Sequence, residues 1–277
     1  MRILIIISSI FIFSQPLWSV SKSDLVTSFN SIYSQENDKA KINQSKKFKS
    51  LLKDYLKENH ALEADLNGLR MFSKKETKDR FRIFNWNIPM EDDNFYECLF
   101  AVPNSKDGFN IIECKPTRKT EDKIANRVLS NKDWPAALYY DIIPMTKGKC
   151  NQFILLGWDG KDEMTNKKLI EILTLGEKNL KFGANKFKEV PKAIKRFVIE
   201  YGEEATVSIN FDEKFNRLVF DHLSPTRPDL DGQFQFYVPD MTFDAFVLKK
   251  GELYLRENVK FLREKTEKDA NFYDPRQ

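Results

Sequence analysis

Apolar and polar residues alternate along the stretch from Arg196 to Pro239. A period of two is typical of a strand with one face in a core and the other in water. The clearest run is at residues 205–211, and similar runs precede and follow it. The polar connections between these runs are short enough for hairpins. The pattern therefore predicts four consecutive antiparallel strands, at residues 196–201, 205–211, 217–223 and 234–238.

Two amphipathic helices are predicted near the N-terminus. Apolar residues recur at helical spacing over residues 23–39 and again over 48–56, with the polar residues 37–46 as a connection. From residue 79 the pattern changes to short apolar runs separated by turn residues. The run at 167–175 suits a strand or a helix, and we predict a strand. The further strands are predicted at residues 80–88, 95–103, 109–114, 134–143, 152–158, 167–175, 242–248 and 252–259.

About twelve strands at this spacing predict a mainly β fold. We expect an antiparallel meander, arranged as a sandwich, a barrel or a propeller-like array, preceded by the two N-terminal amphipathic helices. The chain then divides into a signal peptide, an N-terminal helical segment, an antiparallel β domain and a charged tail. Their bounds are residues 1–19, 20–78, 79–264 and 265–277.

The first residues have the layout of a secretory signal peptide. Arg2 supplies a basic start, residues 3–13 form an apolar run, and Pro16 ends that run. A membrane-spanning helix needs about 20 apolar residues, so this run is too short to be one. We expect a soluble periplasmic or secreted protein that has no transmembrane anchor after cleavage.

Composition and charge limit the class of partner. Hydrophobic residues make up 41% of the chain and include 23 Phe, which is enough for a large core. The 45 basic and 41 acidic residues are interspersed and give a net charge of +4. Nucleic-acid binding needs Lys and Arg clustered on one face, and no sustained basic run exists. We therefore predict no nucleic-acid partner.

In an exported protein, cysteines can form structural disulfides, and this chain has three cysteines. A hairpin centred on Lys106 places Cys98 opposite Cys114 across two strands. Residues in directly opposite positions bring their Cβ atoms near disulfide range. The register predicts a Cys98–Cys114 disulfide and leaves Cys150 as a buried thiol. The alternative is three buried free thiols.

The most unusual local sequence is the run from Asp221 to Pro225, which contains Asp, His and Ser. Neighbours in a strand point to opposite faces, so Asp221 and His222 do not simply form a catalytic relay. We instead predict that polar and aromatic residues at the strand corners contact a ligand. Their alternative role is in turns and packing. The candidate ligand-binding residues are Trp158, Asp159, Asp221, His222, Arg227 and Tyr237.

No cofactor or metal is predicted. Asp229, Asp231 and Gly232 look like part of a calcium loop, but its first and twelfth positions would be Arg227 and Val238, which do not ligate calcium. Only a looser calcium site remains as an alternative. No phosphate-binding loop, zinc spacing or nucleophile elbow is present in the sequence.

Five segments resemble a group of exported proteins from Bacteroidetes-type bacteria. They are RIFNWNIP at 82–89, LLGWDG at 155–160, KRFVIEY at 195–201, VFDHLSP at 219–225 and GQFQFYVPD at 232–240. The resemblance covers roughly residues 45–260 and departs at residues 91–94, where this chain has an acidic turn. It implies a β fold with no assigned activity, so no catalytic residue is transferred.

Two functions are compatible with these features. The first is an exported, non-catalytic binding or structural β protein of the cell envelope, with an unknown envelope or extracellular ligand. The alternative is a hydrolase that acts on glycans or peptides through loop carboxylates. Convergence in one pocket would favour the hydrolase, and the candidates are Asp159, Asp221, Asp231 and Asp240.

Overall fold

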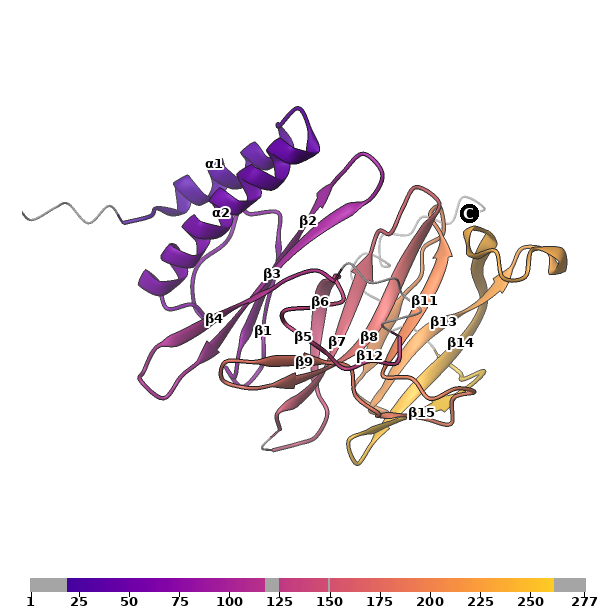
Figure 1. The fold of residues 1–277 in the computed structure, drawn as a ribbon. Helices are drawn as coiled ribbons and strands as arrows, with labels where there is room; N and C mark the ends of the chain where they lie inside the picture. The colour runs from indigo at the N-terminus through magenta and orange to yellow at the C-terminus, as the bar shows by residue number, and fades with distance from the viewer. Residues whose placement is uncertain (1–18, 118–124, 149, 262–277) are drawn as a thin grey trace, which may run out of the picture.

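The computed structural model describes residues 19–117, 125–148 and 150–261, which form four stacked layers. A pair of helices covers one face of a first sheet, and a second and a third sheet follow in order across the molecule (Figure 1). The expected signal peptide, apart from Ser19, and the expected charged tail lie outside the described residues. No helix in the described part of the chain has the length and apolarity needed to cross a bilayer.

The helix pair begins earlier and divides differently than predicted. Helix α1 (Lys22–Tyr33) starts with a capping box, in which Ser21 and Asp24 satisfy each other's backbone amides. Helix α2 (Asp38–Glu58) is capped by Asn37. The prediction of a connection at 37–46 was wrong, because those residues form the cap and the first turns of α2, where Ser45 is buried.

The first sheet contains four antiparallel strands in sequence order. They are β1 (Phe72–Lys75), β2 (Arg82–Pro89), β3 (Asn94–Pro103) and β4 (Phe109–Cys114). Strand β1 lies inside the segment that we expected to be helical, so the β region begins before residue 79. Four residues with two lysines carry too little alternation to be recognised as a strand.

The second sheet lies in the middle and has the order β5-β9-β8-β7-β6, with β11 paired to β8. Its long strands confirm the strand predictions at 152–158 and 167–175. Two of its short strands, β5 and β9, were not predicted. The members are β5 (Leu129–Ser130), β6 (Leu138–Pro144), β7 (Gln152–Asp159), β8 (Thr165–Leu175), β9 (Leu180–Phe182) and β11 (Arg196–Gly202).

The third sheet has the order β10-β15-β14-β13-β12. All its pairings are antiparallel except that of β10 with β15. Its outer face carries the last described residues, with Phe261 packed edge-on against Phe243. The members are β10 (Phe187–Lys188), β12 (Ile209–Asp212), β13 (Arg217–Pro225), β14 (Tyr237–Lys249) and β15 (Glu252–Arg256).

The predicted row of four strands is wrong at both ends. Strand β11 pairs with β8 in the second sheet and not with β12, so residues 203–208 cross between sheets and do not form a hairpin. At the other end, Phe234–Phe236 is a short 3₁₀ helix, η2, and the expected strands 234–238 and 242–248 merge into the single strand β14. Alternation locates strands but does not say which neighbour each strand pairs with.

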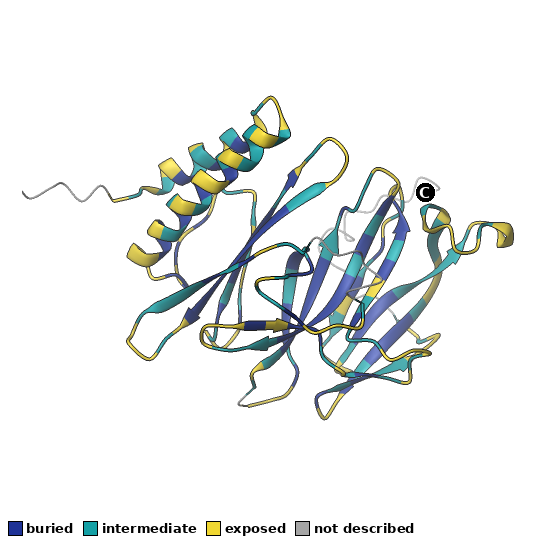
Figure 2. Ribbon diagram, viewed as in Figure 1, coloured by how far each residue is buried: buried dark blue, intermediate teal, exposed yellow. Residues whose placement is uncertain are grey.

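Three apolar cores hold the layers together (Figure 2). One lies between the helices and the first sheet, one between the first and second sheets, and one between the second and third. The first and second sheets are therefore buried on both faces, which explains their continuous apolar runs. The fold prediction is confirmed as mainly β and antiparallel with two N-terminal helices, and the sheets are stacked as in a sandwich.

Candidate functional site

Four of the six predicted contact residues fall into two groups on different sheets, whereas Arg227 lies in an exposed loop and Tyr237 begins β14. Trp158 and Asp159 end β7 in the second sheet. The tyrosine hydroxyls of the first and second sheets engage them, Tyr96 with Asp159 and Tyr201 with Trp158. Tyr96 also accepts a hydrogen bond from the amide of Gly160 at 2.9 Å. This group therefore ties the end of β7 to neighbouring strands.

The second group, Asp221 and His222, lies on β13 in the third sheet. Asp221 accepts hydrogen bonds from the amide and hydroxyl of Ser208, at 2.6 and 2.9 Å. His222 lies at a β-bulge, and its Nδ1 is 2.7 Å from Asp244 Oδ2. Its Nε2 is 4.0 Å from Asp240 Oδ2, which accepts the hydroxyl of Ser224 at 2.9 Å. Ser224 thus pairs with a carboxylate and not with the imidazole.

The Asp244 contact gives a pH-dependent prediction. A hydrogen bond from His222 to Asp244 raises the pKa of the imidazole above 6.5, and partial burial opposes that rise. A base with a raised folded pKa stabilises the fold fully below its unfolded pKa of about 6.5, and this contribution is lost as the pH rises through the folded value. NMR titration should show the raised pKa of His222, and Asp244→Asn should lower it. An unchanged titration in the variant would contradict the assignment.

The carboxylates proposed for hydrolysis have separate local partners. Asp231 accepts the hydroxyl of Tyr237 and Asp240 accepts that of Thr242, whereas Asp221 and Asp159 bind as described above. None of these four lines either of the two hollows described below. Arg227 pairs with Asp229 in an exposed loop at 3.1 Å. The described residues contain no cluster of three or more His, Cys, Asp or Glu suited to a metal ion.

The cysteine register is as predicted, but the disulfide is not formed. Cys98 lies directly opposite Cys114, and both are buried free thiols. The Asn104 amide donates to the Gly108 carbonyl, so alternation makes 98 and 114 a hydrogen-bonded pair. Such pairs are more widely spaced than the non-hydrogen-bonded pairs beside them. The two cysteines face each other across the strands as free thiols, without an S–S bond.

Thiol labelling should count three free cysteines after unfolding. In the folded protein, Cys150 should react first because it is only half-buried. Burial raises the pKa of its thiol, but hydrogen bonds with Thr146 and nearby backbone lower it below the usual value. Burial raises the pKa of Cys98 and should slow its reaction. A count of one after unfolding without reductant would contradict the free-thiol structure.

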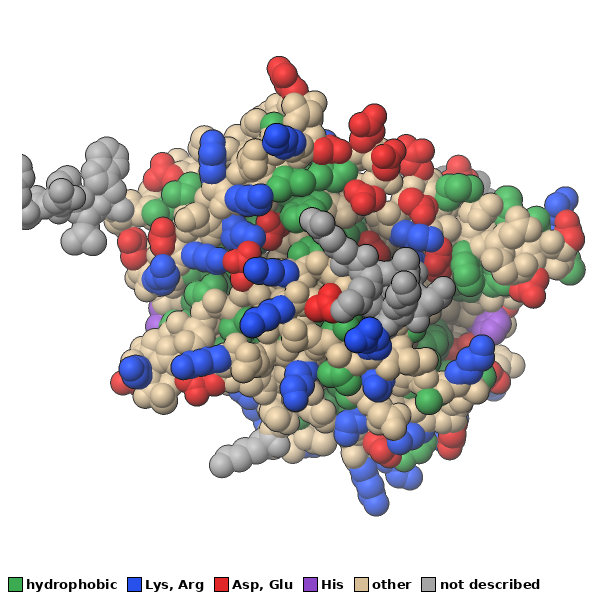
Figure 3. Space-filling view, viewed as in Figure 1, with side chains coloured by type: hydrophobic (Ala, Val, Ile, Leu, Met, Phe, Trp, Pro, Cys, Tyr) green, Lys and Arg blue, Asp and Glu red, His purple; other side chains and the backbone are tan. Residues whose placement is uncertain are grey.

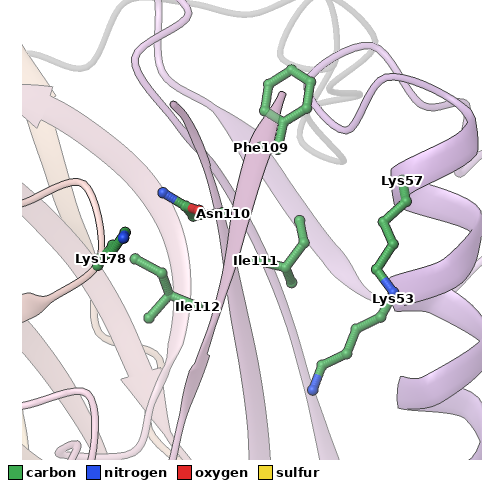
Figure 4. A pocket seen from close by; sticks show the side chains of 7 residues that line it. All are labelled: Lys53, Lys57, Phe109, Asn110, Ile111, Ile112 and Lys178. Atoms are coloured by element: carbon green, nitrogen blue, oxygen red, sulfur yellow. The ribbon is translucent and has the colours of Figure 1, made fainter. Parts of the chain in front are cut away.

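The larger hollow is a groove of about 490 Å³ that crosses the edge strand β4 (Figure 4). Ile111 points toward α2, and Asn110 and Ile112 point the other way, toward the β8–β9 turn. Asn110 donates to the Glu177 carbonyl at 2.9 Å and so fixes that turn against β4. The lining residues are Lys53, Lys57, Phe109, Asn110, Ile111, Ile112 and Lys178. We call this site the β4 groove.

The walls of the β4 groove are basic. Lys53 and Lys57 lie one turn apart on α2, and Lys178 lies on the opposite wall. Glu113 accepts from Lys53 at 2.6 Å, and Lys57 forms an exposed pair with Asp54. Among the described residues, no carboxylate lines the groove itself. Figure 3 shows lysine and arginine side chains gathered over the α2 side of the molecule, with acidic side chains along its upper edge.

The second hollow is smaller, about 320 Å³, and lies on the outer face of the third sheet. Both charge signs line it, because Glu189 and Arg256 form an ion pair there. It therefore has no single electrostatic preference for a ligand.

Sequence reasoning missed the β4 groove. Lys178 is more than 100 residues away from Lys53 and Lys57 along the chain, and only the stacking of layers brings it near them. The one local signal was the spacing of Lys53 and Lys57, which places them on the same helix face. That spacing is equally typical of an ordinary solvated face.

No protein-family model matches the chain, and no curated protein or solved structure is significantly similar to it. The resemblance to exported proteins of Bacteroidetes-type bacteria therefore stays a prediction.

Proposed function

We propose that this is an exported, non-catalytic binding protein of the cell envelope or extracellular space, and that the β4 groove holds an anionic ligand. The observation that carries the proposal is a groove with an apolar floor between two lysine-bearing walls. A concave site with apolar lining and a few placed charges is the usual form of a binding site.

The geometry favours binding over hydrolysis. A glycosidase needs two carboxyl groups on either side of one bond, and the candidate aspartates are engaged with separate partners. The histidine at the β13 bulge lies between two aspartates, and no nucleophile among the described residues forms a hydrogen bond with its Nε2. The corner residues therefore support turns and sheet contacts, and the groove takes the binding role.

The signal-peptide pattern supports export, and export places the groove among envelope and extracellular ligands. N-terminal sequencing of the mature protein tests this part separately. A start near Ser19 or Ser21 is expected, and retention of Met1 on a cytosolic protein would contradict it.

A thermal-shift screen tests the binding proposal. The probes are poly-glutamate, acidic peptidoglycan fragments, neutral oligosaccharides and divalent cations. Free ligand at 100 times its Kd stabilises the fold by about 2.7 kcal/mol, so binding raises Tm. We expect a rise with an anionic probe and none with the neutral ones.

Matched charge variants locate the binding. Lys57→Glu with Lys178→Glu changes two exposed lysines of the groove. Lys147→Glu with Lys192→Glu makes the same change in charge at two exposed lysines elsewhere. The groove variant should lose the shift and the matched variant should keep it. Equal loss in both would mean that net charge, and not the groove, binds the probe.

A further inference from the structure

Strand β4 is the outermost strand of the first sheet, with β3 as its only strand partner among the described residues. The Asn104–Gly108 bond and the alternation of an antiparallel pair turn the even-numbered residues 110, 112 and 114 toward β3. The backbone groups of Phe109, Ile111 and Glu113 therefore point to the free edge.

Two contacts confirm this orientation. The carbonyl of Glu113 accepts the side-chain amide of Asn131 from the outer side, at 3.2 Å. One step further, Lys115 exchanges backbone hydrogen bonds with Asn131 and Trp134, at 2.7 and 2.8 Å. That outer segment covers the end of β4. Phe109 and Ile111 form no such bond with any described segment beyond the strand pair.

The uncovered part of the edge coincides with the β4 groove. Alternate residues of an added strand would point to opposite walls. On one side they would meet Lys53 and Lys57, with Phe109 and Ile111. On the other they would meet Lys178, with Ile112. The groove thus offers the outward backbone groups of β4 for hydrogen bonding, with lysine side chains on both walls.

We propose that the β4 groove binds an extended acidic peptide, which adds to β4 as a fifth strand of the first sheet. This rests on the proposed function and names its ligand class. Strand addition gives affinity through main-chain hydrogen bonds and specificity through alternate side chains. The three lysines select Glu and Asp on both faces of the peptide, and the apolar floor takes residues such as Val.

The charges favour an acidic peptide over a second copy of this chain. Edge-to-edge pairing of two β4 strands would bring the lysines of both copies together, and lysines beside an edge are a common defence against such pairing. A sugar or lipid anion would use the lysines but leave the amides of Phe109 and Ile111 without strand partners.

Fluorescence anisotropy of the mature protein tests the proposal with a labelled octapeptide that repeats Glu-Glu-Val-Val. This repeat puts carboxylates on both faces of a strand. We expect saturable binding that weakens with salt. A control peptide has the same sequence but carries N-methyl groups on backbone amides that face each edge of the strand. It keeps its charge but cannot donate backbone hydrogen bonds to β4, so it should bind at least tenfold more weakly.

Two protein variants complete the test. Lys57→Glu with Lys178→Glu should weaken binding at least tenfold, whereas Lys147→Glu with Lys192→Glu should not. Ile111→Pro removes one outward amide on an edge strand, where proline is tolerated, and should also weaken binding in a variant whose Tm shows that it is folded.

The outcomes separate the two proposals. Equal binding of the N-methylated peptide would overturn strand addition and leave an anion-binding groove. Binding that the groove variant does not weaken would overturn the groove assignment itself. No binding of the octapeptide, or a dimer formed through β4, would overturn the acidic-peptide ligand.

Discussion

Arg196→Met should lower the free energy of unfolding by about 3–5 kcal/mol, because it leaves a buried carboxylate without its counter-ion. Arg196 Nε donates to Glu171 Oε2 at 2.8 Å, and both side chains are almost completely buried. Burial raises the pKa of Glu171, and Arg196 opposes that rise. Urea denaturation, extrapolated to water, measures the difference.

Two controls separate the lost charge pair from the lost side chain. Adding Glu171→Leu should recover much of the loss, since an apolar pair often replaces a buried ion pair at little cost. The recovery will be incomplete, because Arg196 also donates to the carbonyls of Arg127 and Phe182. Arg256→Met breaks an exposed pair with Glu189 and should change stability little. Equal losses in the two single variants would contradict the argument.

The same ion pair explains why the sequence did not reveal where β11 pairs. Alternation at residues 196–201 correctly indicated a strand, but the partner is chosen by contacts such as that of Arg196 with Glu171, 25 residues earlier. By contrast, β4 and the opposition of Cys98 to Cys114 were predictable, because a five-residue turn fixes the register of a hairpin. The local sequence pattern was enough to predict this hairpin. Only the structure showed how strands that are distant in the sequence pair with each other.

The candidate site shows the same limit more strongly. Corner residues such as Trp158 and His222 were conspicuous in sequence, yet they bind neighbouring strands. The β4 groove forms where a helix, an edge strand and a distant turn meet. Its residue types are common surface lysines and core apolar residues, so no local motif marks it.

Lys49→Met should destabilise the docking of α2 by about 3 kcal/mol at neutral pH, because it leaves the buried Glu97 carboxylate without its paired cation. Lys49 reaches Glu97 at 2.7 Å and Glu113 at 2.5 Å, and the Glu97 side chain is only 3% exposed. Burial lowers the pKa of Lys49, but the two carboxylates raise it above its usual value. Lys53→Met is the matched control, because its partner Glu113 is 31% exposed and should tolerate the loss better.

The loss in Lys49→Met should depend on pH. Burial already raises the pKa of Glu97 although Lys49 opposes it, and removing Lys49 raises that pKa further. A carboxyl with a raised folded pKa binds its proton more tightly when folded, so stability falls as the pH rises from its unfolded value of about 4.3 through the folded value. The deficit relative to the unsubstituted protein should therefore be small near pH 4 and largest near pH 7, as measured by urea denaturation at both values. A deficit that is equal at both would mean that Lys49 stabilises the docking of α2 through its aliphatic packing and not through its charge.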